Sequence, residues 1–263
     1  MLSWDLYIQE KAKPGSWNMA VDDYLFRSLE NFPRTVLRFY QWIRPTASLG
    51  YSQKVKDVAD LDFCRDHGVD VVRRITGGKL VLHFDEVTYS LCSSDTDLFS
   101  STLAVSYRRI SEALVRGLER MGLRPTLADA PPQEYSRGNL PCFSYPARNE
   151  VEVQGKKIIG SAQKRIGDRF IQHGSIPLKD STDLLESVSF LKEQGGQVRS
   201  ISLSQALERP VLFKWAVDHL VTGMKDYFSI VPSHITLSEE DLEAIKAIEK
   251  ERYANPIWTA GRP

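Results

Sequence analysis

Hydrophobic positions recur at helical spacing in two long segments of the chain. In residues 16–30, which begin with the capping residue Ser16, the apolar stripe consists of Trp17, Val21, Tyr24, Leu25 and Leu29. This pattern predicts an amphipathic helix that turns Asp22 and Asp23 outward. In residues 101–122 the stripe consists of Leu103, Tyr107, Ile110, Leu114 and Leu118, and Gly122 follows it. This second helix is expected to cover one face of a sheet.

Alternating and β-branched runs predict strands in two clusters. The first cluster contains TVLRFYQW at 35–42, VDVVRRI at 69–75, KLVLHF at 79–84 and EVTYSLCSS at 86–94. Thr76, Gly77 and Gly78 join the second and third runs, which favours hairpins. The second cluster contains NEVEVQG at 149–155, KKIIGSAQKRIG at 156–167 and RFIQHGSIPL at 169–178, with turns at 154–155 and 167–168.

The remaining segments are a short helix, a long loop and a helical end. The helix is expected around 57–68 and should end at Gly68. Residues 128–146 are rich in proline and lack periodicity, which is typical of a long ordered loop with a functional role. No internal repeat is evident. We therefore expect one α+β catalytic domain over residues 1–263, with mixed β-sheets flanked by helices and a mostly helical part over roughly 182–263.

Charge and composition exclude several classes of partner. The 263 residues contain 34 Lys plus Arg and 34 Asp plus Glu, so the formal charge is zero. No large basic face for nucleic acid or a membrane surface is implied, and proteins or small molecules are the expected partners. The start, MLSWDLYIQE, has no pattern of a secretory leader, and no stretch suits a membrane span. A cytoplasmic location is the corresponding expectation.

Several familiar sites are absent from the sequence. A phosphate loop ending in GGKL would need glycine at Arg73 and a hydroxyl at Leu80. No H-E-x-x-H or G-x-S-x-G motif occurs, so zinc hydrolases and α/β-hydrolases lack their primary signal. The three cysteines are widely spaced and suit neither a disulfide framework nor a Cys-x-x-Cys metal site. Neither a metal nor an organic cofactor is expected.

One cysteine has an unusual context. Cys64 and Cys92 belong to periodic elements, where a free cysteine is usually an inert buried residue. Cys142 instead lies in the irregular loop, in PCFSYP, and is the candidate nucleophile, although packing of the loop is the alternative. A nucleophilic thiol needs a nearby cation or base. Lys157 is the candidate, with a solvated strand lysine as the alternative.

The segment RRITGGKLVLH at 73–83 places two arginines beside two glycines. Arginines hold phosphate or carboxylate groups, and unhindered backbone N–H groups can bind an oxygen, so Arg73, Arg74, Gly77 and Gly78 are candidate ligand contacts. Surface charges and a tight turn are the alternative. His83 and His173 are equally compatible with binding and with structural roles.

Seven blocks of the sequence together resemble the lipoate ligase and octanoyltransferase family, which is related to biotin ligases. The blocks are WNMAVDDYLF, LRFYQWIRPTASLGYSQ, RRITGGKLVLH, CFSYP, GKKIIGSAQKR, QHGSIPL and RYANPIWTAGR. The resemblance implies a biotin/lipoate ligase-like α+β fold with a pocket for an eight-carbon acyl chain. It also implies protein lipoylation as the biological context.

Two branches of this family use different chemistry, and the sequence looks more like the cysteine-dependent octanoyltransferases. Cys142 and Lys157 match that branch's nucleophile and the lysine near its acyl carbonyl. Lys79 follows two glycines, where ligases usually have a third glycine. The chain also stops soon after YANPIWTAGR, without the accessory domain that many ligases append. Arg148 and Asn149, in ARNEV, depart from this pattern and resemble the ligases.

The resemblance implies octanoyl transfer from acyl carrier protein, through a thioester on Cys142, to a lysine of a lipoyl domain. That domain would belong to the glycine-cleavage carrier or to a dehydrogenase E2 subunit. The remaining expected substrate contacts are Gly160, Ser161, Ala162, Gln163, His173 and Gly174. Two other functions remain open, namely an ATP-dependent lipoate-protein ligase and a non-catalytic acyl or lipoyl-domain binder.

Overall fold

The computed structural model describes residues 2–99, 102–129, 149–190 and 198–260. The strands are β1 (Trp4–Ile8), β2 (Thr35–Tyr40), β3 (Thr46–Leu49), β4 (Asp70–Arg73), β5 (Val81–His83), β6 (Glu86–Ser93), β7 (Thr126–Leu127), β8 (Val151–Val153), β9 (Lys156–Ile166), β10 (Arg169–Pro177) and β11 (Ser233–His234). The α-helices are α1 (Gly15–Ser28), α2 (Leu61–Asp66), α3 (Thr96–Phe99), α4 (Leu103–Arg120), α5 (Thr182–Val188), α6 (Leu203–Ala206), α7 (Phe213–Phe228), α8 (Glu239–Ile248) and α9 (Pro256–Ala260).

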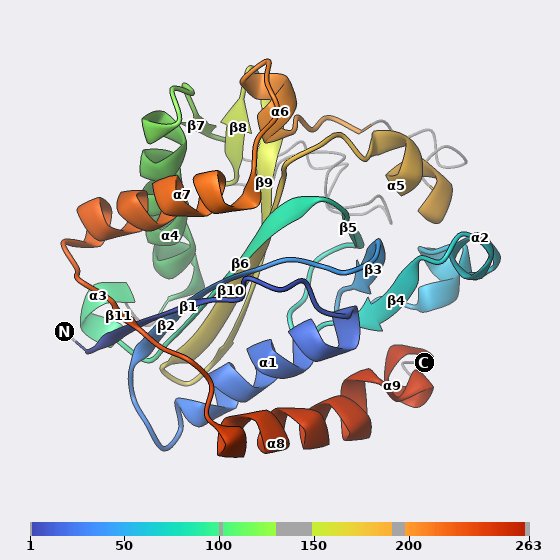
Figure 1. Ribbon diagram of the computed structural model, residues 1–263, viewed down its shortest axis with the longest axis horizontal. Helices are drawn as coiled ribbons and strands as arrows, with labels where there is room; N and C mark the ends of the chain where they lie inside the picture. Colours follow the sequence, from blue (N-terminus) through green and yellow to red (C-terminus); the bar gives the residue numbers. More distant parts are fainter. Residues whose placement is uncertain (1, 100–101, 130–148, 191–197, 261–263) are drawn as a thin grey trace.

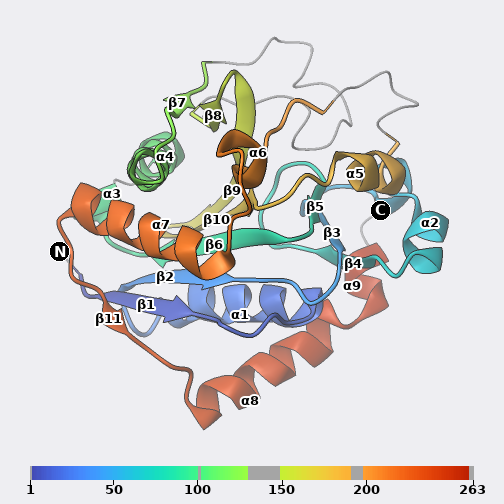
Figure 2. The same ribbon diagram turned by 45° about the horizontal axis from the view of Figure 1, so that its top comes forward.

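The large sheet has eight strands in the order β11-β1-β2-β6-β10-β9-β8-β7. β1 pairs in parallel with β11 and β2, whereas the other neighbours are antiparallel, so the sheet is mixed. Helices cover both faces: α4 and α7 lie on one side, and α1 with α8 lies on the other (Figures 1 and 2). The predicted α+β fold with mixed sheets flanked by helices is confirmed.

Each face of the large sheet carries its own hydrophobic core. Leu37, Phe39, Tyr89 and Leu91 pack against α4 and α7, while Val36 and Cys92 belong to the core beneath α1 and α8. All six residues of β2 are consequently buried, because the alternating side chains meet a helix on either face. Glycines allow α4 and α7 to cross closely, since a Cβ on Gly223 would lie 2.2 Å from the backbone nitrogen of Gly117.

A second, three-stranded sheet has the order β4-β3-β5. The hairpin predicted between 69–75 and 79–84 is therefore wrong, because β3 lies between the two strands and pairs with both. The glycine-containing segment after β4 instead crosses from one edge of this sheet to the other. In the second cluster the predicted turns are confirmed: Gln154 and Gly155 have φ of 55° and 68°, and Gly167 has φ of 57°.

Two further expectations about the helices are wrong. Asp22 and Asp23 do not face outward on α1 but are buried, with 1% and 3% of their surface exposed. Leu103, at the start of α4, is 51% exposed, although Ile110, Leu114 and Leu118 of the predicted stripe are buried as expected. Asp22 has partners in the sheet, which connects this error to the functional site, whereas Asp23 accepts from Arg27, Arg252 and Tyr253.

Candidate functional site

Two cavities meet at the glycine segment that follows β4. The inner cavity holds about 400 Å³ of empty space between the large sheet, α1 and the small sheet. The cavity is a narrow slot. The outer cavity, of about 880 Å³, is lined partly by the start of α4. Gly78, Ser161 and Ala162 line both cavities and mark where one opens into the other.

The strand register explains the floor of the inner cavity. Gly160 pairs with Ser175, Ser175 with Thr88, and Thr88 with Tyr40, so these four residues form one row across β9, β10, β6 and β2. Directly paired residues of antiparallel strands point to the same face. This floor row spans three strand spacings, or about 14 Å. It begins beside the junction of the two cavities and ends at Tyr40.

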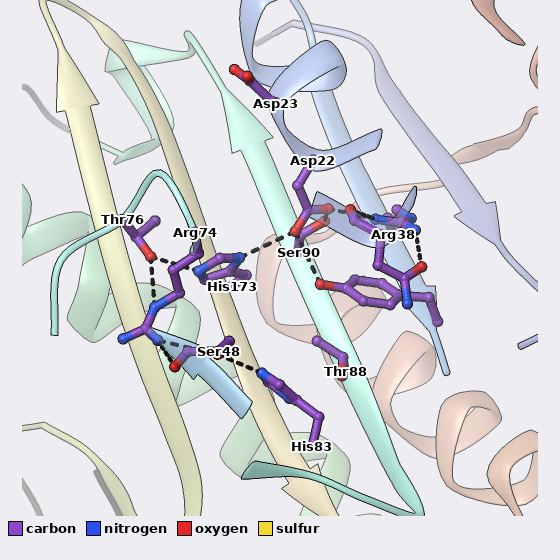
Figure 3. A network of polar contacts seen from close by, with 12 residues as sticks. Asp22, Asp23, Arg38, Ser48, Arg74, Thr76, His83, Thr88, Ser90 and His173 are labelled. Carbon is purple, nitrogen blue, oxygen red and sulfur yellow. Dashed lines mark hydrogen bonds and ion pairs between the residues drawn. The ribbon is translucent and has the colours of Figure 1, made fainter. Parts of the chain in front are cut away.

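Arg74 lines the inner cavity and is the centre of a network of hydrogen bonds (Figure 3). One branch of hydrogen bonds runs from its Nε to Thr76 Oγ1 at 3.1 Å. The Thr76 hydroxyl lies 2.7 Å from Nε2 of His173, and Nδ1 of His173 lies 3.1 Å from Asp22 Oδ2. Burial, the largest effect, lowers the pKa of His173 and favours the neutral ring. The guanidinium therefore donates to the hydroxyl, the hydroxyl to the imidazole and the imidazole to the carboxylate, which only accepts.

A second branch has the same order of groups. Nη1 of Arg74 donates to Ser48 Oγ at 3.1 Å, and this hydroxyl lies 2.8 Å from Nε2 of His83. Nδ1 of His83 donates to Glu86 Oε1 at 2.7 Å, since a carboxylate only accepts. Glu86 also accepts from the hydroxyls of Thr88 and Ser175. Each branch thus ends on a buried carboxylate.

Arg38 balances the charge of the first carboxylate. Its guanidinium is fully buried and lies 2.6 Å from Asp22 Oδ1, and Tyr40 and Ser90 also donate to Asp22. Burial opposes ionisation of Asp22, but Arg38 and the hydrogen-bond donors outweigh it and lower the pKa of this carboxyl. Burial and the neighbouring Asp22 raise the pKa of Tyr40 well above its ordinary value, so its hydroxyl stays a donor.

These carboxylates determine what the inner cavity presents to a ligand. Asp22 draws the hydroxyl of Tyr40 toward itself, and Glu86 does the same for Thr88 and Ser175. The polar atoms of the floor row are therefore engaged within the protein, and most of the surface turned toward the cavity is apolar. A narrow, mostly apolar slot suits an unbranched hydrocarbon chain.

Arg74 also fixes the glycine segment at the junction. Its Nη2 donates to the carbonyls of Gly77 and Lys79 at 2.9 and 2.7 Å. Gly78 has φ of 92°, a conformation that favours glycine, and a Cβ on Gly50 would lie 1.9 Å from the Gly78 carbonyl oxygen. Arg74 thus donates to the protein's own backbone and side chains, whereas the sequence indicated a direct contact with a phosphate or carboxylate group of a ligand.

Arg73 has a structural environment that the sequence did not indicate. It is fully buried, and its guanidinium donates to the carbonyls of Gly50, Tyr51 and Gln53 on one side and of Trp258 and Thr259 on the other. The indole of Trp258 donates in return to the Arg73 carbonyl at 2.9 Å. Arg73 therefore fastens α9 to the turn after β3, and the predicted substrate contact does not fit this position.

Lys157 is buried, with 1% of its surface exposed, and its ammonium lies 2.7 Å from Oε2 of Glu150. The alternative of a solvated lysine is therefore wrong. A β-bulge on β9 separates Lys157 from Ile159, so the alternation that begins at Ile159 and includes Ser161 and Gln163, which line the outer cavity, does not extend to Lys157. The predicted nucleophile Cys142 and the predicted contact Arg148 lie outside the described residues.

Most other predicted contacts gather around the two cavities. Gly77, Asn149 and Gln163 line the outer cavity, while Gly160, His173 and Gly174 line the inner one. Gly174 permits close packing, because a Cβ there would lie 2.6 Å from both Ser161 Oγ and the Tyr89 ring. Lys79 lies beside the junction and is partly exposed.

The two described cysteines are free and buried, as the sequence predicted. Burial raises the pKa of Cys64 to about 11 and that of Cys92 well above its ordinary value, so both thiols are poor nucleophiles. Among the described residues no group of His, Cys, Asp and Glu could hold a metal ion. Within the same ranges no helix is long and apolar enough to cross a bilayer.

Sequence reasoning missed several residues of the site: Met19, Asp22, Arg38, Tyr40, Ser48, Glu86, Thr88 and Glu150. One signal was available. Arg38 lies in the middle of the strongly apolar run VLRFY, where a charged side chain with both neighbouring faces buried requires an internal counter-ion. The distant partner in α1 is not marked in the sequence.

Comparison with known proteins agrees with this architecture. The family description "Lipoyl protein ligase A/B catalytic domain" matches residues 14–225. The chain belongs to this family. The octanoyltransferase LipM of Carboxydothermus hydrogenoformans is 34% identical, with 96% of this chain and 97% of that protein covered. LipM of Lysinibacillus sphaericus is also 34% identical, over 98% of this chain and 99% of its own. The predicted family relationship is confirmed.

The same fold occurs in solved structures of this family. The bi-partite lipoate protein ligase from Thermoplasma acidophilum superposes with a TM-score of 0.79, at 21% identity, and the match covers 100% of this chain and 98% of that one. The sheets and helices that form the two cavities of this family member are therefore part of a shared architecture.

Replacing Asp22 by asparagine should destabilise the protein by roughly 3–5 kcal/mol at pH 7, because Arg38 would lose its buried counter-charge. The pKa of Asp22 is lower in the folded than in the unfolded protein. The contribution of the ionised carboxylate to stability is therefore complete above about pH 4, and it is lost as the pH falls from there through the folded pKa. Denaturant unfolding at pH 7 and pH 3 measures the free energy of unfolding of variant and wild type. The difference between the two free energies should be smaller at pH 3.

Asp62→Asn is the matched control, since Asp62 forms an exposed pair with Arg65 and should change stability by less than about 0.5 kcal/mol. An Asp22→Asn variant as stable as wild type at pH 7 would show that the buried charge is not a structural requirement.

Proposed function

We propose that this protein is an octanoyltransferase that moves octanoyl from acyl carrier protein, through a thioester on Cys142, to a lysine of a lipoyl domain. The observation that carries the proposal is the narrow, mostly apolar slot that opens at the glycine segment into the outer cavity. The slot suits the hydrocarbon chain, and the wider outer cavity suits the carbonyl and its carrier. Relatives that bear the name octanoyltransferase match nearly the whole chain.

The proposed reaction exchanges one thioester for another. The Cys142 sulfur bonds to the octanoyl carbonyl carbon, the bond from that carbon to the pantetheine sulfur breaks, and the released thiolate takes up the proton that Cys142 gives up. The free energies of the two thioesters are similar, so neither ATP nor a metal is needed. In the second step the lysine amine attacks the Cys142 thioester, an amide forms and the thiol returns.

Lys157 is the proposed partner of Cys142. An ammonium beside the thiol favours the thiolate and stabilises the negative charge that develops on the carbonyl oxygen. The buried pair with Glu150 holds the lysine head in one place, which a flexible solvated lysine would not achieve. Cytoplasmic acyl carrier protein and a lipoyl domain, of the glycine-cleavage carrier or a dehydrogenase E2 subunit, complete the proposal as donor and acceptor.

The second candidate is an ATP-dependent lipoate-protein ligase. The segment ARNE favours it, and the bi-partite ligase of Thermoplasma acidophilum has the same fold. A likeness of fold at 21% identity does not decide between the two chemistries. The Cys142 thiol distinguishes the two chemistries, because a route through an acyl-adenylate has no need of it.

Wild-type enzyme incubated with octanoyl-acyl carrier protein and no ATP should gain one octanoyl group. Intact-mass analysis detects the adduct, which should map to the peptide containing LPCFSYP and should be released by neutral hydroxylamine. Addition of a lipoyl domain should discharge it onto the lysine. Cys142→Ala should form no adduct, and Cys142→Ser little, because a hydroxyl is a much weaker nucleophile.

Cys64→Ala and Cys92→Ala serve as matched controls and should form the adduct, since both thiols are buried with raised pKa values. The proposal is overturned if no adduct forms and if ATP-dependent attachment of free lipoate survives Cys142→Ala.

Lys157→Ala should slow adduct formation at least 100-fold while the affinity for the carrier changes little, because the ammonium acts on charge that develops during the reaction. Single-turnover mass spectrometry gives the rate, and a binding titration gives the affinity. Lys156→Ala, which removes the exposed neighbour on the same strand, is the control. The double variant Lys157→Ala/Glu150→Gln should be equally slow, which excludes an effect of the unpaired carboxylate. A normal rate in both would remove Lys157 from the mechanism.

Gly77→Val should abolish transfer without altering the fold. A Cβ at Gly77 meets nothing within 4 Å, and the added side chain would occupy space of the outer cavity. Thermal unfolding and the transfer assay report the two properties separately. Full turnover in this variant would show that the substrate does not pass this residue.

A further inference from the structure

We propose that Met19 and Tyr40 form the closed end of the inner cavity and that Met19 sets the length of the acyl chain. This inference rests on the proposed function, because it assumes that the inner cavity receives an acyl chain. It assigns the discrimination between chain lengths to one side chain of α1.

The floor row gives the cavity a direction. Its first residue, Gly160, lies beside Ser161 and Ala162, where the inner cavity opens into the outer one. Its last residue, Tyr40, lies three strands away on β2. A chain that enters at β9 and follows the row therefore approaches Tyr40 with its methyl end.

Two contacts bracket Met19 and place it beside Tyr40. Residues three and four apart share one face of a helix, so Gly15, Met19 and Asp22 lie on the same face of α1. A Cβ on Gly15 would lie 3.2 Å from the Trp42 ring, and Asp22 accepts from the Tyr40 hydroxyl at 3.0 Å. Met19 lies between these two contacts, faces the end of β2 and lines the inner cavity.

The two residues of this end wall differ in how firmly they are held. Tyr40 donates to Asp22, and its ring lies under the Arg38 guanidinium, whose central carbon is 3.8 Å from the ring centroid. Met19 is 3% exposed and has an unbranched side chain without a polar anchor. Tyr40 is thus a fixed wall, and Met19 is the part of the wall that a substitution can move.

The dimensions agree with this assignment. Seven carbon–carbon bonds of about 1.5 Å, in an extended zigzag, give an octanoyl chain a length of roughly 9 Å. The floor row spans about 14 Å between the axes of β9 and β2, and part of this distance is filled by the end-wall side chains. Little space remains for further methylene groups.

The test compares transfer of hexanoyl, octanoyl, decanoyl and dodecanoyl groups from acyl carrier protein to a lipoyl domain. Met19→Ala removes three heavy atoms from the end wall and should raise the ratio of kcat/KM for decanoyl over octanoyl at least 10-fold. Met19→Phe should shift the optimum toward hexanoyl. Met121→Ala, which truncates a buried methionine that does not line the cavity, should leave the ratio unchanged.

Equilibrium binding of the free fatty acids of the same lengths, measured by calorimetry, tests the end wall without turnover. The same shift from octanoate toward decanoate is expected in Met19→Ala. Transfer with an unchanged length profile in both Met19 variants would overturn the inference and leave the proposed function intact. Wild-type enzyme that transfers none of the four groups refutes the proposed function, and the binding profile then decides the inference separately.

Discussion

The site depends on the hydrogen bonds of the Arg74 guanidinium. Through Thr76 and Ser48 it supports two imidazoles, and through the carbonyls of Gly77 and Lys79 it fixes the segment that separates the two cavities. Five donors in a rigid planar group make this possible, which a lysine could not reproduce. One buried cation thus sets the shape of the slot wall and of its opening together.

Such a buried cation is tolerated because the neighbourhood is electrically balanced. Arg38 forms a buried ion pair with Asp22, and Arg74 is linked to the carboxylates of Asp22 and Glu86 through one hydroxyl and one imidazole in each branch. The same carboxylates satisfy the hydroxyl groups of the floor row. A wall made largely of polar residues can therefore bind hydrocarbon, since its donors are already engaged and its carbon atoms face the cavity.

The sequence predicted the fold class, the long helices and the β8–β10 strands, because each depends on local spacing. It failed where charges are paired across the fold. A helical stripe assigns Asp22 to solvent, and only the position of Arg38, on a strand packed against the same helix, reverses that assignment. The hairpin error has the same origin, since β3 enters between two runs that are neighbours in the sequence.

The contacts of Arg73 join two segments that are synthesised at different times. Its guanidinium donates to the carbonyl of Gly50 and to those of Trp258 and Thr259. The last two lie 185 and 186 residues after Arg73 in the chain. At roughly 5–20 residues per second, a ribosome needs about 10–40 s to synthesise the interval. During that time only the carbonyls of Gly50, Tyr51 and Gln53 are available to the arginine, and those of α9 are missing. The contacts between Arg73 and α9 can therefore form only after the last residues of the described chain have been synthesised.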